Sequence, residues 1–316
     1  MVLAAGAGSA TPSAPASAAN ATSRLCGLRR QAAKTRHIIW IIFENHSTDQ
    51  IIGPPGSVAA TKMPYLNTIA RSCGLAANYH AITHPSLPNY IALTSGSTHG
   101  LRGDCRACSV DGGSIFSRLH HARRSWRSYE ENMPKPCGQR DTTLYAKRHN
   151  PAAYYSALRP ACRRYDIRLG RPTRGPLHRA LARGRLANFV LIIPNLCHDM
   201  HSCAPQSADA WLQRWLPRLT GSAAYRRGHT VIFLLTEEGG HHGRRGERCR
   251  LSAEPSCIVP LIVVGASTRP GTVSRRDFSH YSLLRTTQEL LAAGRLLGHA
   301  GDTSTRSLAS TFNLRP

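Results

Sequence analysis

The sequence lacks several features that would place the chain in common classes of protein. It has no run of eighteen apolar residues, so no transmembrane segment is expected. It has no second Cys-x-x-Cys motif to match the one at 105–108, so a structural zinc site is disfavoured. Acidic residues are scarce, with 17 Asp and Glu against 41 Lys and Arg.

The scarcity of acidic residues gives the chain a formal net charge of +24, and the arginines are spread along its whole length. Such a field attracts anions, including phosphate esters, nucleic acid and acidic lipid. An Arg-rich composition that is solvated all over the surface explains the same charge. The charge therefore allows anionic partners, a small phosphate-ester substrate as well as polyanions or anionic surfaces, but it identifies no reaction.

Cysteine is abundant, with ten residues in an even number. An even count with close local pairs predicts disulfides and an oxidising compartment, so we expect a secreted, extracellular or cell-envelope protein. The close pairs are Cys105/Cys108, Cys197/Cys203 and Cys249/Cys257.

The first residues contain mostly Ala, Ser, Gly, Thr and Pro, with no charge before Arg24. They lack the basic and long apolar segments of a secretory signal. We interpret 1–35 as a flexible leader or the remnant of a signal peptide. The rest of the chain, 36–316, is expected to form a single catalytic domain.

Four apolar runs of strand length predict a central sheet, at 37–43, 189–193, 230–235 and 258–264. Helical patterns at 208–219 and 281–291 lie among them. Apolar strands that alternate with helices indicate a mostly parallel sheet with helices on both faces, a three-layer α/β/α sandwich. The region 101–186 shows no buried strand, so we interpret it as a disulfide-rich insertion that caps the strand ends.

Polar clusters follow three of the predicted strands, at 44–47, 194–201 and 236–242. Because the carboxyl ends of parallel strands share one edge, these clusters are expected to meet there. Carboxylates crowded at one place repel each other unless a cation lies between them. Hard oxygen ligands with some imidazole predict a divalent metal such as Ca²⁺, Mg²⁺, Mn²⁺ or Zn²⁺.

A serine flanked by prolines, Ser86 between Pro85 and Pro88, is a candidate nucleophile. The prolines fix the backbone on both sides and reduce the entropy lost in presenting the hydroxyl. Thr83, three residues earlier, is the alternative nucleophile. A metal beside the hydroxyl would lower its pKa and offset charge on a phosphate ester.

Seven segments then resemble a known family in the right order, at 43–47, 84–90, 125–137, 145–151, 194–201, 236–240 and 278–286. They are similar to the bacterial and fungal phosphoesterases, the acid phosphatases and phospholipases C of the alkaline-phosphatase-like superfamily. The resemblance covers about 36–291 and implies the alkaline-phosphatase-like fold.

The resemblance also implies roles for individual residues. The metal ligands would be Glu44, Asn45, Ser86, Glu237 and Glu238, although relatives usually carry Asp where this chain has Glu237. The catalytic residues would be Ser86, which becomes phosphorylated, His149, Asp199 and His201. The substrate-binding residues would be His84, Asn89, Asn150 and Asn195.

Several activities are compatible with these residues. We expect an acid-phosphatase-like phosphomonoesterase that acts through a phosphoseryl intermediate. A phospholipase C-type phosphodiesterase is the alternative, although 101–186 is basic where acyl chains would need an apolar rim. An inactive protein that binds polyanions or a cell surface is an alternative of another class. A sulfatase or phosphoglycerate-mutase-like relative would need metal ligands richer in Asp and His.

Overall fold

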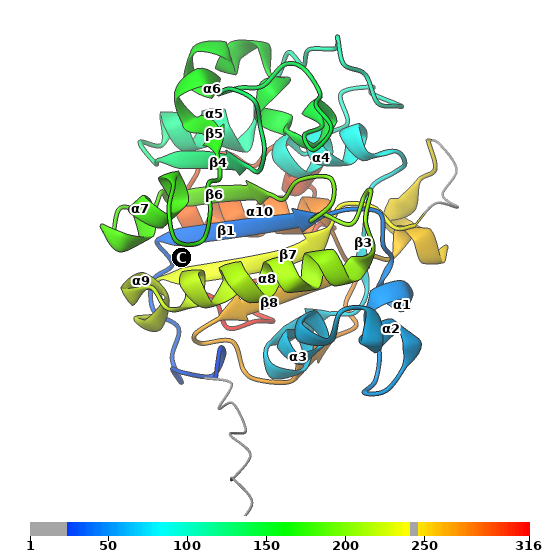
Figure 1. The fold of residues 1–316 in the computed structure, drawn as a ribbon, viewed down its shortest axis with the longest axis vertical. Helices are drawn as coiled ribbons and strands as arrows, with labels where there is room; N and C mark the ends of the chain where they lie inside the picture. Colours follow the sequence, from blue (N-terminus) through cyan, green and yellow to red (C-terminus); the bar gives the residue numbers. More distant parts are fainter. Residues whose placement is uncertain (1–23, 241–245) are drawn as a thin grey trace, which may run out of the picture.

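The computed structural model describes residues 24–240 and 246–316 (Figure 1). The greater part of the expected leader, 1–23, lies outside these residues. The described chain contains an eight-stranded sheet in the order β5-β4-β6-β1-β7-β8-β2-β9 and a two-stranded sheet of β10 and β3. The strands are β1 His37–Phe43, β2 Gly74–Ala76, β3 Tyr79–His80, β4 Trp126–Glu130, β5 Asp166–Arg168, β6 Phe189–Ile193, β7 Thr230–Thr236, β8 Leu261–Gly265, β9 Thr272–Ser274 and β10 Phe278–Ser279.

All four predicted strands form, and β5, β4, β6, β1 and β7 are parallel. The fourth, β8, pairs antiparallel with β7 and begins only at Leu261, after Pro260. No α-helix separates β7 from β8 in the described chain, so β8 starts at the edge where β7 ends and runs back.

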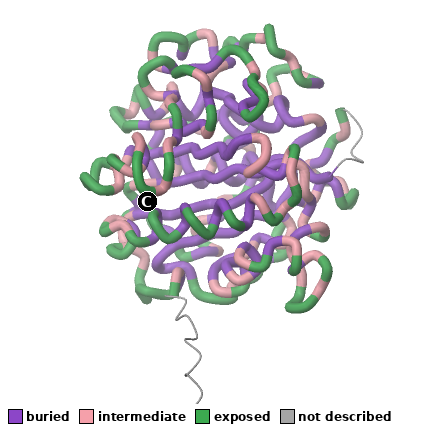
Figure 2. The backbone as a smooth tube through the Cα atoms, in the orientation of Figure 1, coloured by how far each residue is buried: buried purple, intermediate pink, exposed green. Residues whose placement is uncertain are grey.

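Helices cover both faces of the sheet, as expected for three layers (Figures 1 and 2). Alternate residues of β1 point to opposite faces, Ile38 into one apolar core and Ile39 into the other. Helices α4, α5, α6 and α10 pack on the first face, and α3, α7, α8 and α9 on the second. The helices are α1 Thr48–Ile51, α2 Val58–Lys62, α3 Pro64–Ser72, α4 Ser86–Ser95, α5 Ile115–His121, α6 Arg159–Tyr165, α7 Pro176–Ala182, α8 Pro205–Thr220, α9 Ala223–Arg226 and α10 His280–Leu291.

Both predicted helices are present as α8 and α10. Short 3₁₀ helices complete the chain: η1 Lys147–His149, η2 Pro151–Ala153, η3 Ser156–Leu158, η4 Cys249–Leu251, η5 Pro255–Cys257 and η6 Gly298–Gly301. In the described part of the chain, no helix is long and apolar enough to cross a bilayer.

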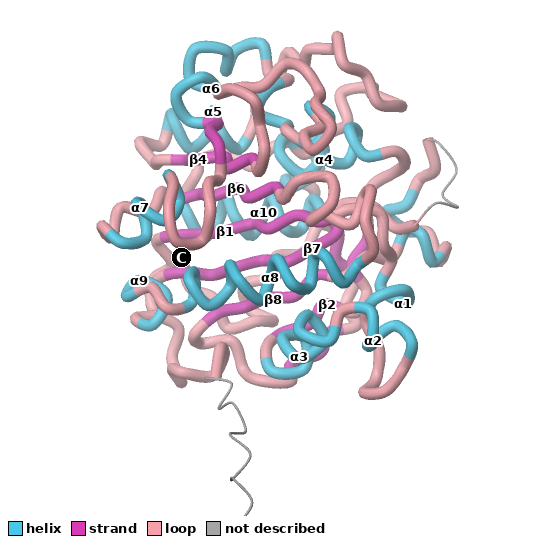
Figure 3. Tube along the Cα trace, viewed as in Figure 1, coloured by secondary structure: helices cyan, strands magenta, loops and turns pink. Residues whose placement is uncertain are grey.

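The interpretation of 101–186 as a region without strands was wrong. It supplies β4 and β5, which extend the central sheet beyond β6. The sequence concealed β4 because Arg127, Ser128 and Glu130 interrupt any apolar run, and two of them are buried polar residues. Loops and short helices form the rest of this region (Figure 3).

Five disulfides link all ten cysteines, and the three close pairs are bonded as expected. Cys105 and Cys108 are bonded to each other and so hold no zinc. The remaining pairs are Cys26–Cys73 and Cys137–Cys162.

The expected domain boundary at residue 36 was also wrong for 24–35. Cys26 is buried in its disulfide, and the backbone N–H of Thr35 donates to the carbonyl of Arg315 at 2.8 Å. The sequence concealed this attachment because the segment has no apolar run and is held by a cross-link and backbone hydrogen bonds.

Two carboxyl groups are buried in the edge formed by β4 and β5. Glu130 accepts a hydrogen bond from Ser128 Oγ at 2.8 Å, and Asp166 Oδ2 accepts one from Asn150 Nδ2 at 2.7 Å. Burial raises the pKa of Glu130 well above its ordinary value and that of Asp166 to about 8. Asp166 is therefore mostly protonated and neutral in the folded protein at pH 7.

We expect the Cys26–Cys73 disulfide to stabilise the fold more than Cys105–Cys108, because it closes a loop of 47 residues rather than 3. Replacing Cys26 and Cys73 by Ser should lower the free energy of unfolding by about 4 kcal/mol, against about 2 kcal/mol for Cys105 and Cys108. Urea unfolding of the two double variants measures the difference. Equal losses would contradict a loop-closure origin.

We expect the free energy of unfolding to fall as pH rises from about 4 to about 8. Folded Asp166 keeps its proton in this range, whereas the unfolded side chain, with a pKa near 3.8, releases it. The unfolded state then binds fewer protons, so each pH unit costs about 1 kcal/mol. Asp166→Asn should flatten the dependence seen in urea unfolding at several pH values. Identical slopes for the variant and the parent protein would refute this assignment.

Candidate active site

Three carboxylates converge where β1 and β7 end. The strands are parallel with Phe43 opposite Thr236, so Glu44 and Glu237, the next residues, emerge side by side. The backbone N–H of Glu237 donates to the carbonyl of Phe43 at 3.1 Å and fixes this register beyond the strand. Glu44, Glu237 and Glu238 are buried, and each has an oxygen within 4.8 Å of the others. These three residues form the carboxylate cluster.

Ser86 is the first residue of α4, directly after its N-cap, Pro85. Its Oγ lies 3.1 Å from Glu44 Oε2 and 2.9 Å from Glu238 Oε1, so the hydroxyl donates to the carboxylate cluster. Thr83 Oγ1 donates instead to the carbonyl of His84 at 3.3 Å. The fold thus brings the hydroxyl of Ser86 to the carboxylates and directs that of Thr83 to the backbone.

Asn45 adds an amide to the carboxylate cluster. Its φ of 47° lies in the left-handed region, which Asn tolerates better than most residues. With its nitrogen facing the cluster, the amide lies 2.9 Å from Glu44 Oε2 and 3.2 Å from Glu238 Oε1. In the opposite orientation the amide presents its oxygen to the same place, as a cation ligand would.

The buried carboxylates of the cluster repel each other, and a positive charge among them would be stabilising. Burial raises the pKa of Glu44 to about 7, and burial with the charges of Glu44 and Glu238 raises that of Glu237 well above its usual range. Neither carboxylate oxygen of Glu237 has a hydrogen-bond partner in the described chain. A divalent cation would satisfy these oxygens and offset the repulsion, so the residues present fit one. Its oxygen ligands would be Glu44, Asn45, Ser86, Glu237 and Glu238.

His149 lies behind the cluster, at the end of η1. Its Nε2 is 3.3 Å from Glu44 Oε1 and its Nδ1 is 3.2 Å from Asp199 Oδ2. The imidazole stacks on Tyr90, with ring centroids 5.4 Å apart. Burial lowers the pKa of His149 and raises that of Asp199 to about 8, and both residues are almost inaccessible to solvent. They are placed to hold Glu44 rather than to touch a substrate.

His201 and Arg148 lie closer to solvent. An Nη2–H of Arg148 donates to His201 Nε2 at 2.7 Å, and its Nε is 3.4 Å from Asp104 Oδ2. The backbone N–H of His201 donates to Asp199 Oδ1 at 2.8 Å. A guanidinium and an imidazole are therefore joined to the buried His149–Asp199 pair, where they can meet an anion.

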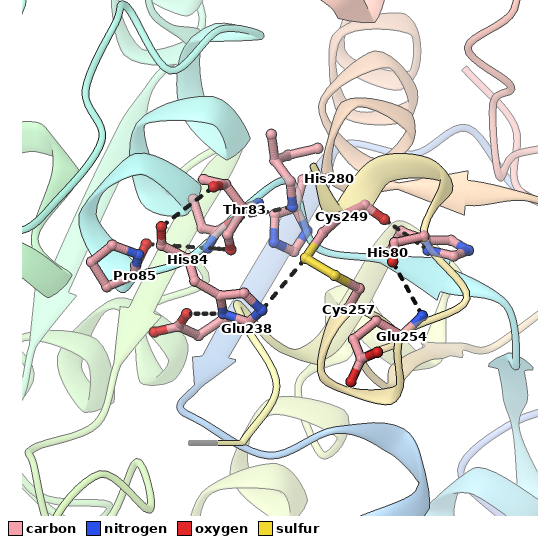
Figure 4. Close-up of a disulfide and its surroundings, with 12 residues drawn as sticks. His80, Thr83, His84, Pro85, Glu238, Cys249, Glu254, Cys257 and His280 are labelled. Carbon is pink, nitrogen blue, oxygen red and sulfur yellow. Dashed lines mark hydrogen bonds and ion pairs between the residues drawn. A yellow bond between two sulfur atoms is a disulfide. The ribbon is translucent and has the colours of Figure 1, made fainter. Parts of the chain in front are cut away.

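His84 connects the nucleophile loop to the cluster and to a disulfide (Figure 4). Its Nδ1 is 2.5 Å from Glu238 Oε2, and its Nε2 is 3.5 Å from the Sγ of Cys249, which is bonded to Cys257. The backbone N–H of Cys249 donates to the carbonyl of Ile82 at 3.0 Å. The loop closed by the Cys249–Cys257 disulfide thus supports the segment that precedes Ser86, and through His84 it also supports the side chain of Glu238.

Three amides expected to bind substrate are used by the protein itself. Asn89 Oδ1 accepts hydrogen bonds from two backbone N–H groups of the loop before Ser86. Asn195 Oδ1 accepts from two backbone N–H groups of its own loop. Asn150 Nδ2 donates to Asp166. These hydrogen bonds support the loops of the site, and the substrate-binding role of the three amides stays a prediction.

Two residues at the site were missed by the sequence analysis. The hydroxyl of Tyr90 donates to Glu44 Oε1 at 2.7 Å, and Arg148 bonds to His201. Tyr90 follows Ser86 by four residues on α4, so the helical period alone would have placed both on one face. No comparable signal marked Arg148 among so many arginines.

Comparison with known proteins places the chain in a family. The sequence profile of the Phosphoesterase family matches residues 56–291. Phosphatidylinositol-3-phosphatase of Mycobacterium tuberculosis is 27% identical over 270 residues, which cover 84% of this chain and 80% of that protein. An acid phosphatase of Aspergillus fumigatus is 25% identical over 222 residues, 66% of this chain. The chain spans only 46% of the length of that fungal relative.

Solved structures share the fold at low sequence identity. A protein of the alkaline phosphatase superfamily from Vibrio parahaemolyticus gives a TM-score of 0.62 at 11% identity and covers 89% of this chain and 71% of its own. A phosphonate monoester hydrolase from Silicibacter pomeroyi gives 0.55 at 12% identity, with coverage of 89% and 78%. The predicted fold is confirmed, and the family profile covers most of the chain. The chain belongs to the Phosphoesterase family, with the fold of the alkaline phosphatase superfamily.

Proposed function

We propose that the chain hydrolyses phosphate monoesters by transferring the phosphoryl group to Ser86. The observation that carries the proposal is the position of Ser86 Oγ at the start of α4, within hydrogen-bond distance of Glu44 and Glu238. Family membership supports phosphate-ester hydrolysis, and the relatives described above are named phosphatases.

The carboxylate cluster, Asn45 and Ser86 would hold the divalent cation. When bound, it supplies positive charge that lowers the pKa of the hydroxyl and neutralises phosphate oxygens. The proton of Ser86 Oγ passes to a carboxylate oxygen of Glu238, which His84 supports from the other side. The oxygen–phosphorus bond to Ser86 forms as the bond to the leaving alcohol breaks. Water then cleaves the phosphoserine and regenerates the hydroxyl.

The remaining groups divide into those that meet the phosphate and those that hold the ligands. The N-terminus of α4 and the guanidinium of Arg148 offer positive charge to phosphate oxygens. His201 accepts a hydrogen bond from Arg148 and would help to orient its guanidinium toward the phosphate. His149 and Asp199 act as positioning residues, because they are buried against Glu44.

A monoester is favoured over the phospholipase C-type diester. The large apolar side chains that are exposed in the described chain are dispersed: Leu28, Val58, Leu144 and Val273. They form no rim for acyl chains. The charged cluster is also not explained by an inactive polyanion-binding protein, which would have no need to bury three carboxylates together. The five disulfides support an oxidising location, so we retain export as part of the proposal.

Replacing Ser86 by Ala should abolish turnover of 4-nitrophenyl phosphate, because no other hydroxyl of the loop is directed to the carboxylate cluster. We expect kcat to fall by at least about 10³-fold. Steady-state kinetics measure the change, and circular dichroism checks the fold.

Thr83→Ala is the matched control, since it removes a neighbouring hydroxyl that bonds to the backbone. This variant should keep most of the activity. Acid-quenched parent protein should carry phosphate on Ser86, as detected by mass spectrometry of peptides. Full activity of Ser86→Ala, or loss only in Thr83→Ala, would reverse the assignment of the nucleophile.

Glu237→Gln tests the cation site without relying on activity. Removing one of three crowded carboxylates should raise the melting temperature in chelator, because the repulsion falls. The same change should reduce the stabilisation that Mg²⁺, Ca²⁺, Mn²⁺ or Zn²⁺ gives to the parent protein. Glu289→Gln, on the distant Arg285 pair, is the control. A cation response that Glu237→Gln leaves intact would remove Glu237 from the ligand set.

A further inference from the structure

A cavity lies between β4, β5 and α7, with a volume of about 380 Å³. Figure 1 shows α7 at the edge of the sheet where β1 and β7 begin, opposite the edge where these strands end. The carboxylate cluster follows the ends of β1 and β7. The cavity is therefore separate from the candidate active site. Its volume is within the range of small-ligand pockets.

The rim of this cavity is strongly basic. Its lining includes five arginines and no Asp or Glu of the described chain: Arg124, Arg127, Arg179, Arg183 and Arg185. None of these five guanidinium groups forms an ion pair with a carboxylate in the described residues. Elsewhere on the molecule Arg106, by contrast, pairs with Asp141. Five cations around one cavity, with no carboxylate paired to them, attract an anion more strongly than the same charges dispersed over a surface.

The floor of the cavity is aromatic. The guanidinium carbon of Arg127 lies 4.6 Å from the centroid of the Tyr165 ring and that of Arg164 lies 5.5 Å from it, so Tyr165 holds Arg127 by a cation–π contact. Tyr129 is 2% exposed, and its hydroxyl makes no hydrogen bond within the described chain. Burial raises the pKa of Tyr129, while Arg127 and Arg179 act on it with opposite effect. The hydroxyl therefore remains a neutral donor at the floor, close to two cations.

We propose that this cavity binds a small organic anion that joins a flat ring to a phosphate, sulfate or sulfonate group. The ring lies against the guanidinium of Arg127, which Tyr165 holds, and the anionic oxygens accept hydrogen bonds from Arg179 and the Tyr129 hydroxyl. Arginine suits such oxygens because its planar fork can donate two parallel hydrogen bonds. The proposal is independent of the reaction at Ser86.

The test is isothermal titration calorimetry of the whole chain with naphthalene-1-sulfonate, which has both parts of the ligand and no cleavable ester. Inorganic sulfate supplies the charge alone and 1-naphthol the ring alone, and both should bind more weakly. Arg179→Ala and Arg127→Ala should each raise Kd about tenfold. Arg127→Lys keeps the charge and loses the planar group, so its Kd should lie between that of Arg127→Ala and that of the parent protein.

The matched control is Arg214→Ala, on the exposed side of α8, which removes the same charge away from the cavity. It should change Kd by roughly twofold or less. The turnover of 4-nitrophenyl phosphate by Arg179→Ala should equal that of the parent protein, which separates this cavity from the Ser86 site. Equal Kd values for all variants, or an equal loss in Arg214→Ala, would overturn the proposal. If sulfate and naphthalene-1-sulfonate bound with equal Kd, the cavity would recognise the anionic group alone and the proposed contact with a flat ring would be wrong.

Discussion

The repulsion between three buried carboxylates is the constraint on which the rest of this site depends. Two parallel strands in register bring Glu44 and Glu237 together, and Glu238 follows directly. Their burial is unfavourable without compensating positive charge, so a cation bound at this edge of the sheet would stabilise them. Ser86 and Asn45 complete the same cluster. The core strands therefore determine where the chemistry takes place.

The second requirement is that the loop before Ser86 is held in a fixed position beside the carboxylate cluster. Asn89 holds the loop through its backbone N–H groups, and the disulfide loop of Cys249 and Cys257 braces it from the other side. His84 joins this support to Glu238. A hydroxyl held in this way loses little further freedom on reaction, which is how positioning contributes to catalysis.

Much of the fold could be predicted from the sequence, because buried strands and amphipathic helices leave periodic apolar patterns. The four predicted strands and both predicted helices are present. The strand β4 was missed because buried Ser128 and Glu130 satisfy each other by a hydrogen bond and so leave no apolar run. The reversed direction of β8 was missed because periodicity carries no information on strand direction. Asn89, Asn150 and Asn195 look alike as polar residues, and only their partners show that they support the loops.

The sequence by itself determined the layered fold, the placement of acidic clusters after strands, and the candidate nucleophile. These are local properties: an apolar run, its end, and a serine between prolines. Only the tertiary structure decided that Glu44 meets residues nearly two hundred positions later, that Thr83 bonds to the backbone, and that five arginines line one cavity. Such contacts depend on strand register and helix packing. These bring together side chains that are far apart in the sequence, so the sequence positions do not predict the contacts.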